Sequence, residues 1–407
     1  MNARTLLSLP VLLAAACFSR AADQTTYAVF EVLAANAKEV RVLGDSDLIL
    51  MSEDLQIGLN RMAVPQKQQW KMLTLGLPYQ FVELYKPIDH GPGTGVTDGT
   101  DYRNEYLNYD TLLAEYDATL AQYPHLVKKI QIGSTIQNRP MYAYRVYKDN
   151  LRESFRARNN IVITGTIHAR EWISPSVVLH NFKMTVEELA TTDTLYTDRL
   201  TDNCAIYFIP VTNPDGYIYT WTTQRLWRKN RRQVTTSVYG VDLNRNYGYQ
   251  WGNNNGSSGN PSSETYRGTA PFSEPETQAV RDLSNSLPNV KGFIDYHSYG
   301  QHILWPWSYT TTPPPNAAYL QSVGTAIQSA IMATPGSVAY DAGQASTTLY
   351  ISSGASKDWF FAQFGGFTTT IELRNLNSFE LPTNQITPTQ DENWNGFKAF
   401  VLNLSMN

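Results

Sequence analysis

Two histidines and a glutamate stand where they could bind one metal ion. His168 and Glu171 have the H-x-x-E spacing in "IHAREW", which follows an apolar run, and His297 ends the apolar run "KGFIDYH". This spacing lets an imidazole and a carboxylate converge on one ion, and hydrolytic zinc sites commonly use two histidines and a glutamate. H-x-x-E alone is a weak pattern, since polar residues that merely end strands would look the same. The position of both histidines at strand ends favours a metal site.

A third acidic residue ends another apolar run. Glu372 lies between Ile371 and Leu373 in "TTTIELR", so on a strand it would face away from both neighbours. An inward-facing glutamate needs a partner or a chemical role, and the general base of a metal-dependent hydrolase is such a role. An ion pair with Arg374 is the alternative that this segment leaves open.

Three arginines lie in polar motifs near these residues. Arg170 is inside "IHAREW", Arg228 inside "RLWRKNRR" and Arg245 inside "GVDLNRNY". A guanidinium group suits recognition of a carboxylate and stabilisation of a developing negative oxygen. Each alone is more often a solvated surface charge. Together with a hydrolytic metal site they indicate a pocket for the anionic end of a substrate.

Alternating strands and helices would position these side chains. Apolar runs predict strands at residues 160–165, 205–212, 291–297 and 367–374. Helical spacing predicts helices around 112–123, 174–189, 273–287, 316–333 and 393–404, and Ser273 with Glu276 has the spacing of a capping box. This alternation predicts an α/β domain with a mixed central sheet flanked by helices. Ligands of such folds bind beyond the strand ends, where the polar motifs lie.

The chain before this domain has a boundary of its own. Residues 86–103, "KPIDHGPGTGVTDGTDYR", are rich in Gly, Pro, Asp and Thr and have no apolar periodicity, as is typical of a linker. Residues 23–85 combine a strand-like run at 27–33 with shorter mixed segments, enough for a small α+β unit. We therefore expect two folded units joined by residues 86–103.

The N-terminal residues have the pattern of a signal peptide. Arg4 precedes an almost wholly apolar run from Leu6 to Cys17, and Ser19 and Ala21 are small residues suited to a cleavage site after Ala21. The run falls short of the roughly 20 residues of a membrane span, and no other segment is long and apolar enough. We expect a signal peptide at residues 1–21, a secreted protein and no membrane partner.

Charge and cysteine content narrow the function further. The net charge of −4 and the absence of a broad basic face predict no nucleic-acid partner. Of the two cysteines, Cys17 would leave with the signal peptide, and Cys204 lies in an apolar run where it reads as a buried small hydrophobe. The mature chain would have no internal disulfide.

The motifs together resemble one enzyme family. "IHAREW", "NPDGY", "RLWRK", "VDLNRN", "DYHSY", "LYISSG" and "IELR" occur in the order found in the pancreatic A/B-type zinc metallocarboxypeptidases, in their procarboxypeptidase (zymogen) form. The resemblance spans nearly the whole chain. It implies a carboxypeptidase-like catalytic domain at 104–407 after a ferredoxin-like activation domain and linker at 22–103. The enzyme would be a monomer that removes C-terminal residues from peptides and proteins, with digestion as the commonest use of this architecture.

The resemblance also implies a role for each matching residue. One zinc ion would be bound by His168, Glu171 and His297, with Asp242 accepting the second ring N–H of His168. Glu372 would take a proton from the attacking water and return it to the leaving amine, while Arg228 would help hold the oxyanion. The substrate's terminal carboxylate and the peptide beyond it would be bound by Asn244, Arg245, Tyr350 and Arg170.

Lys357 departs from both types of relative. The matching position lies at the base of the pocket for the substrate's last side chain, where A-type members have an aliphatic residue and B-type members an aspartate. The pocket candidates Ala345, Ser346, Ser352 and Thr370 are small or polar. An ammonium group there predicts a preference for C-terminal glutamate. The alternative is a lysine that faces solvent or is neutralised by Asp358.

The sequence also indicates where the proenzyme would be cleaved. Between Lys71 and Lys128 the only basic residues are Lys86, which precedes a proline, and Arg103, so a trypsin-like protease is expected to cut Arg103–Asn104 and release the inhibitory pro-domain.

Rival interpretations are A-type specificity for apolar C-terminal residues, a catalytically silent peptide-binding relative, and an amidase or deacylase on the same scaffold. Family members from vertebrates generally have a disulfide that this chain lacks, which leaves open how the "NNNGSSGNPSS" segment is held.

Overall fold

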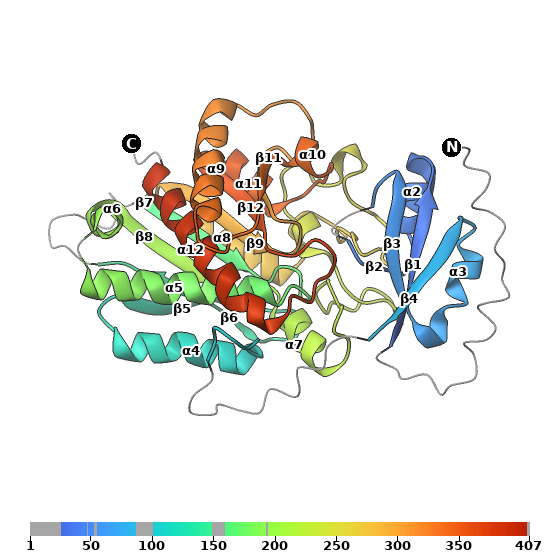
Figure 1. The fold of residues 1–407 in the computed structure, drawn as a ribbon, viewed down its shortest axis with the longest axis horizontal. Helices are drawn as coiled ribbons and strands as arrows, with labels where there is room; N and C mark the ends of the chain where they lie inside the picture. Colours follow the sequence, from blue (N-terminus) through green and yellow to red (C-terminus); the bar gives the residue numbers. More distant parts are fainter. Residues whose placement is uncertain are drawn as a thin grey trace.

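The computed structural model describes residues 26–46, 48–52, 55–86, 101–148, 159–192 and 194–404. A small N-terminal unit lies at one end of a larger α/β unit, against the loops that surround the large sheet (Figure 1). The expected signal peptide at 1–21 and most of the expected linker lie outside the described residues. None of the described helices is both long and apolar enough to cross a membrane.

The N-terminal unit is a four-stranded antiparallel sheet with helices on one face. Its strands are β1 (Tyr27–Ala34), β2 (Ile49–Leu50), β3 (Gly58–Pro65) and β4 (Tyr79–Tyr85), in the order β2-β3-β1-β4. Its helices are α2 (Ala37–Gly44), η1 (Gln66–Gln68) and α3 (Lys71–Thr74). This arrangement confirms the expected ferredoxin-like α+β unit.

The two faces of this small sheet have different partners. Because successive strand residues point to opposite faces, β1 directs Ala28, Phe30 and Val32 into the core beneath the helices. The alternate residues Tyr27 and Val29 pack instead on the large unit, in a cluster that also contains Ile49, Met51, Ala63, Leu226, Tyr299 and Phe379. One strand therefore holds the small unit together and attaches it to the large one.

The large unit is built on an eight-stranded mixed sheet, as expected. The strands are β5 (Val127–Ser134), β6 (Pro140–Val146), β7 (Asn159–Gly165), β8 (Cys204–Ile209), β9 (Val290–His297), β10 (His302–Trp305), β11 (Asp341–Gln344) and β12 (Phe367–Glu372). Their order is β11-β10-β12-β9-β7-β8-β6-β5, and β12, β9, β7 and β8 form a parallel block at the centre. Each central strand is buried along its length, as is typical of parallel sheets covered on both faces.

Helices cover both faces of this sheet (Figure 1). On one face, Ile161 and Ile163 of β7 share a core with α4 (Tyr109–Gln122), α5 (Ile173–Thr191), α6 (Leu195–Asn203), α9 (Ala317–Met332) and α12 (Ile386–Asn403). On the other, Val162 packs with α8 (Pro275–Ser286) and α11 (Ser356–Phe364). The remaining short elements are α7 (Pro214–Thr222), η3 (Leu243–Arg245), η4 (Asn253–Asn255), α10 (Ala345–Thr348) and η5 (Thr383–Gln385).

The capping box expected at Ser273 is absent. Helix α8 begins at Pro275 after Glu274, and no side chain caps its first turn. Ser273 Oγ donates to Glu274 Oε1, and Glu276 Oε1 accepts the N–H of Ile136 in a neighbouring turn. The side chains of Ser273 and Glu276, which the local sequence pattern assigned to the cap, therefore form other hydrogen bonds.

Polar contacts hold the segment at 253–263 without a disulfide, and the only described cysteine, Cys204, is buried and forms no disulfide. The buried Lys229 directs Nζ to the carbonyl oxygens of Pro261 (3.1 Å) and Ser263 (2.8 Å). Arg267 Nη1 donates to the Ser257 carbonyl, 3.1 Å away. Charged donors bonded to backbone carbonyls take the place of a covalent link.

We predict that Lys229→Met loosens this segment, because two backbone carbonyls lose a charged donor. The expected loss is about 1–3 kcal/mol of local stability. Backbone hydrogen exchange at residues 257–265 should therefore quicken by roughly 5- to 100-fold. Lys128→Met, at an exposed lysine, is the control and should leave exchange there unchanged. Equal exchange in the two variants would contradict the assigned role.

Candidate metal centre and substrate cleft

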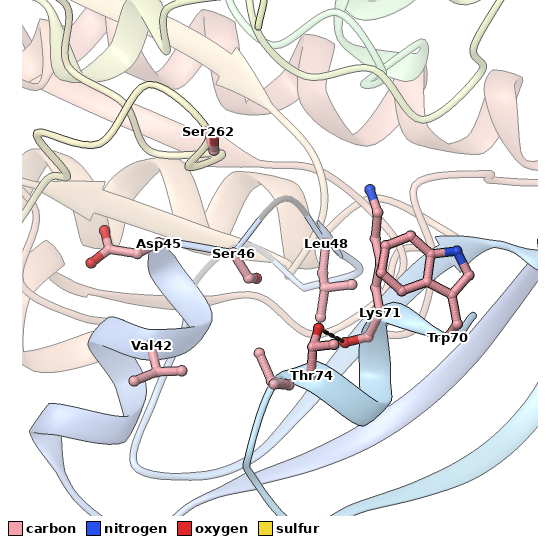
Figure 2. Close-up of a pocket in the computed structure, with 9 residues that line it drawn as sticks. Val42, Asp45, Ser46, Leu48, Trp70, Lys71, Thr74 and Ser262 are labelled. Atoms are coloured by element: carbon pink, nitrogen blue, oxygen red, sulfur yellow. Dashed lines mark hydrogen bonds between the residues drawn. The ribbon is translucent and has the colours of Figure 1, made fainter. Parts of the chain in front are cut away.

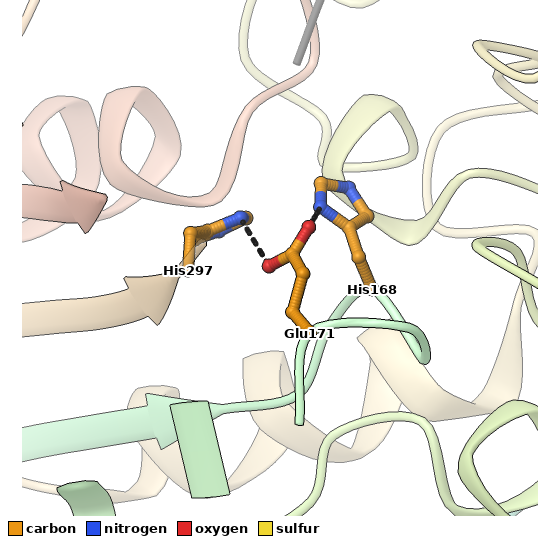
Figure 3. Close-up of side chains that lie close together, drawn as sticks. All are labelled: His168, Glu171 and His297. Carbon is orange, nitrogen blue, oxygen red and sulfur yellow. Dashed lines mark hydrogen bonds and ion pairs between the residues drawn. The ribbon is translucent and has the colours of Figure 1, made fainter. Parts of the chain in front are cut away.

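The three expected metal ligands converge at the carboxyl ends of two neighbouring strands. His168 and Glu171 lie in the turn after β7, and His297 is the last residue of β9, which pairs in parallel with β7. Figure 3 shows the Glu171 carboxylate between the two imidazoles. Its Oε1 lies 2.7 Å from His168 Nδ1 and its Oε2 lies 3.3 Å from His297 Nδ1. One ligand atom from each residue fits within 4.8 Å of the others, and all three side chains are buried.

These residues fit a zinc ion. His297 Nδ1 is buried and forms no hydrogen bond with the residues that the structure describes, although Glu171 Oε2 lies 3.3 Å away. An unsatisfied ring nitrogen in a buried site is costly, and it points at the same spot as His168 and Glu171. Two imidazoles and one carboxylate are a common ligand set for hydrolytic zinc, with a further position left for water.

The electrostatics of the site favour a bound cation. Burial raises the pKa of Glu171, but the two histidines outweigh it and hold this pKa well below its usual range. Burial lowers the pKa of His297, but Asp295 and Glu171 outweigh it and hold this pKa well above its usual value. Burial, together with Arg228, lowers the pKa of His168. The carboxylates around the two imidazoles therefore attract positive charge, which a proton or a metal ion can supply.

Glu372 reaches the same cleft from β12. Its strand pairs in parallel with β9, and Glu372 is opposite His297 in the register. Burial raises the pKa of Glu372 to about 8, and its Oε2 has no hydrogen-bond partner among the described residues. A divalent cation in the centre would favour the ionised form. The alternative ion pair with Arg374 does not occur, because Arg374 bonds Glu392 instead.

Of the three arginines singled out in the sequence, Arg228 and Arg245 lie near the metal ligands and Arg170 lies at the contact between the two units. Arg228 Nε and Nη2 donate to Asp242 Oδ2 at 3.2 and 3.1 Å, and Asp242 Oδ1 lies 3.1 Å from His168 Nε2. Arg245 lines the cleft, with Nη1 donating to the Asn244 carbonyl and its guanidinium 6.0 Å from the Tyr350 ring centre. Arg228 and Arg245 thus stand near the metal centre.

Arg170 lies outside this cleft. Its Nη1 donates to the Leu50 carbonyl of the N-terminal unit at 2.8 Å, and its guanidinium stacks 3.9 Å from the centre of the Phe379 ring. Tyr299 OH donates to the next carbonyl of the same segment, that of Met51. The small unit therefore presents consecutive backbone carbonyls to two side chains of the large unit.

The cleft is lined mostly by polar and charged residues, together with three aliphatic ones. It is lined by His168, Asn244, Arg245, His297, Leu304, Ala345, Leu349, Tyr350, Ser352, Lys357, Thr370 and Glu372. Leu304 and Leu349 were not anticipated from the sequence, and Ser346, which was, directs its hydroxyl to the Thr310 carbonyl. Gly354 closes the loop after Tyr350 with φ +71°, and a Cβ there would lie 2.3 Å from the Arg245 carbonyl oxygen. Only glycine fits that approach.

A larger pocket lies elsewhere and lacks this chemistry. Figure 2 shows it between the N-terminal unit and Ser262 of the large unit, with Trp70 and Lys71 on one side. None of its lining residues belongs to the metal cluster. The smaller cleft, which contains the metal ligands, is the candidate functional site.

Lys357 lines the cleft and is not neutralised by its neighbour. Its side chain is only 4 % exposed, and burial lowers its pKa. The Asp358 carboxylate is committed elsewhere, accepting bonds from the Ser308 N–H (2.8 Å), the Ser308 hydroxyl (3.1 Å) and the Tyr309 N–H (3.3 Å). Among the described residues, none forms an ion pair with Lys357. Both alternatives, a solvated lysine and a pair with Asp358, disagree with this geometry.

Asp295 is a further residue of the site that the sequence motifs did not indicate. It lies two positions before His297 on the same face of β9, and its Oδ2 is 3.1 Å from His297 Nε2. A carboxylate inside an apolar strand, in phase with a candidate ligand, was the available signal.

Comparison with known proteins gives a consistent result. The sequence profile of the family described as zinc carboxypeptidase matches residues 112–396. Carboxypeptidase A1 of Rattus norvegicus is 37% identical over 301 residues, covering 73% of this chain and 70% of the relative. Carboxypeptidase B of Astacus astacus is also 37% identical, covering 72% and 95%.

Solved structures agree over nearly the full length. The crystal structure of thrombin activatable fibrinolysis inhibitor superimposes with a TM-score of 0.80 at 28% identity, covering 93% of this chain and 98% of the other. The carboxypeptidase A of Helicoverpa armigera shares the fold, with a TM-score of 0.78 at 24% identity over 94% of this chain and 98% of the other.

We predict that the three ligands are needed for metal retention and that Glu372 is not. His168→Ala and His297→Ala should lose zinc on dialysis, because each removes one of three protein donors. Glu372→Gln should retain one zinc per chain and lose hydrolysis of C-terminal peptide bonds by several orders of magnitude. Metal content by mass spectrometry and single-turnover rates measure the two effects. Near-normal hydrolysis by Glu372→Gln would contradict its role as the base.

Proposed function

The chain belongs to the zinc carboxypeptidase family, and on that premise we propose that it is a secreted zymogen whose active form prefers C-terminal glutamate. Its activity as a metallocarboxypeptidase follows from the family. The observation that supports the glutamate preference is the buried Lys357 ammonium, which lines the cleft without an ion-pair partner among the described residues. Secretion is proposed from the signal-peptide pattern at residues 1–21.

We assign the metal to His168, Glu171 and His297. Zinc bound there would supply a Lewis acid that polarises the scissile carbonyl and favours loss of a proton from water. Glu372, opposite His297 in the strand register, accepts that proton and then delivers it to the leaving amine nitrogen. Arg228, held by two bonds to Asp242, donates to the oxygen that becomes negative when water adds to the carbonyl.

The substrate's terminal carboxylate would be bound by Asn244, Arg245 and Tyr350. All three line the cleft, and the Arg245 fork suits a carboxylate. An internal peptide bond offers no carboxylate at this distance, so this group of residues restricts cleavage to the C-terminal bond. It also argues against an amidase or deacylase, which has no need to recognise a terminal carboxylate. No catalytic or metal-binding residue of the family pattern is missing, which disfavours a silent relative.

The last side chain of the substrate would meet Lys357. A buried ammonium without an anion pays an uncompensated desolvation cost, and the carboxylate of a C-terminal glutamate would remove it. Aspartate would fall short of the same position, and lysine or arginine would bring a like charge. Leu304 and Leu349 on the wall favour the second candidate, A-type specificity for apolar residues. The two candidates differ in whether charge or apolar contact dominates binding.

The N-terminal unit, which we assign to residues 22–103, would inhibit the catalytic domain at 104–407. Its support is the contact of the Leu50 carbonyl with Arg170, which the family resemblance assigns to peptide binding, and of the Met51 carbonyl with Tyr299. A trypsin-like protease is proposed to cut Arg103–Asn104. The residues there form a turn against α12, where Arg103 Nη2 pairs with Asp391 and the Arg103 carbonyl accepts from Thr387. Cleavage therefore requires this turn to detach first.

We predict that wild-type enzyme cleaves a Glu-ending peptide about 100-fold or more faster, in kcat/KM, than its Gln-ending twin. These two residues match in shape and differ in charge. Lys357→Met should bring the ratio close to one, and Lys357→Ile should shift preference toward apolar ends. Lys357→Arg keeps the charge and is the control. Faster cleavage of Phe or Leu ends than of Glu by the wild type would establish the A-type alternative.

We predict that trypsin-like activation yields a chain that begins at Asn104. Asp391→Ala should make this cleavage several-fold faster, because Arg103 loses the ion pair that holds its turn on α12. N-terminal sequencing of the active form and the time course of cleavage measure the two effects. Glu115→Ala, which removes another surface ion pair of the same unit, is the control. An active form that starts well outside residues 86–104 would refute the assignment.

A further inference from the structure

The two candidate zinc-binding imidazoles have matching surroundings. Each directs Nδ1 toward Glu171 and Nε2 toward an aspartate. Asp242 Oδ1 lies 3.1 Å from His168 Nε2, and Asp295 Oδ2 lies 3.1 Å from His297 Nε2. The family resemblance implied the first of these aspartates and gave no role to the second.

Asp295 is held firmly from both sides. It is fully buried on β9 and pairs in register with Thr164 of β7, whose hydroxyl donates to Oδ1 at 2.8 Å. The Ser356 hydroxyl, at the start of α11, donates to Oδ2 at 2.7 Å. Because side chains alternate along a strand, Asp295 and His297 face the same side of the sheet. The carboxylate therefore cannot move away from the imidazole without breaking two other bonds.

This geometry has a chemical consequence for His297. A neutral imidazole carries one ring proton, and a carboxylate beside Nε2 keeps the proton on that nitrogen. The lone pair of Nδ1 is then free to bind a metal, and the ring cannot rotate out of position. Partners of this kind also raise the basicity of the metal ligand.

We propose that Asp295 is a positioning residue for the metal centre, which orients His297 and strengthens zinc retention. This inference rests on the proposed zinc site. The alternative is that Asp295 only accepts the hydrogen bonds of Thr164 and Ser356 in the core. In that case its replacement would affect folding alone. Zinc release separates the two, because a mere filler would not change how tightly a correctly folded site holds the ion.

The test measures zinc release from the full chain to a coloured chelator, without any need for activation. Asp295→Ala should release zinc about 10- to 100-fold faster than wild type, and Asp295→Asn, which keeps a polar acceptor but loses the charge, should fall between them. Asp215→Asn is the matched control. It alters another buried aspartate, bonded to Thr135 and Arg139 away from the metal cluster, and should not change zinc release.

Melting temperatures of the zinc-free proteins show whether each variant still folds. Release within twofold of wild type by a folded Asp295→Ala overturns the proposal while leaving the zinc site intact. Failure of the wild type itself to hold zinc overturns the proposed function instead. If Asp295→Ala does not fold, the proposal can be tested by NMR of the ring N–H groups in zinc-loaded wild type labelled with ¹⁵N-histidine. Two ring N–H signals protected from exchange, from His168 and His297, support the proposal, and protection of His168 alone overturns it.

Discussion

The parallel pairing of β7, β9 and β12 is the constraint on which the rest of the structure depends. It places the turn of His168 and Glu171, the end of β9 at His297, and the end of β12 at Glu372 along one edge of the sheet. Since side chains alternate, a slip of one residue would turn Glu372 to the opposite face. Strands buried on both faces resist such a slip, so the apolar core fixes the geometry of the polar site.

Charge balance explains why so many ionisable groups tolerate burial here. Glu171, Asp242, Asp295 and Glu372 surround two imidazoles, with Arg228 as one bonded counter-charge. A zinc ion would offset much of the remaining negative charge. Lys357 is the opposite case, a buried cation whose neighbour Asp358 is occupied with the Ser308 turn. Buried charges usually have an ion-pair partner in the protein, and exceptions are often found where a substrate supplies that partner. Lys357 fits that pattern.

The N-terminal unit uses one sheet for two purposes. Alternate residues of β1 form its own core and its contact with the large unit, so the same strand periodicity serves both the folding and the attachment of the small unit. Its carbonyls at Leu50 and Met51 accept hydrogen bonds from Arg170 and Tyr299 of the large unit. The inhibition that we propose for this unit would need no contact with the metal ligands themselves.

Periodicity in the sequence predicted the four central strands and most of the covering helices, because buried parallel strands are apolar throughout. The polar motifs at the strand ends indicated the candidate metal ligands, and the composition of residues 86–103 separated off the small α+β unit. The periodicity missed the outer strands β5, β6, β10 and β11, which are short or partly exposed and so have weaker patterns. Only the tertiary structure decided that Glu372 avoids Arg374, that Asp358 leaves Lys357 unpaired and that Asp295 meets His297. Each of these contacts depends on which side chain, often distant in the sequence, the fold brings within bonding distance of a buried donor or acceptor. The spacing of residues along one segment does not specify that partner.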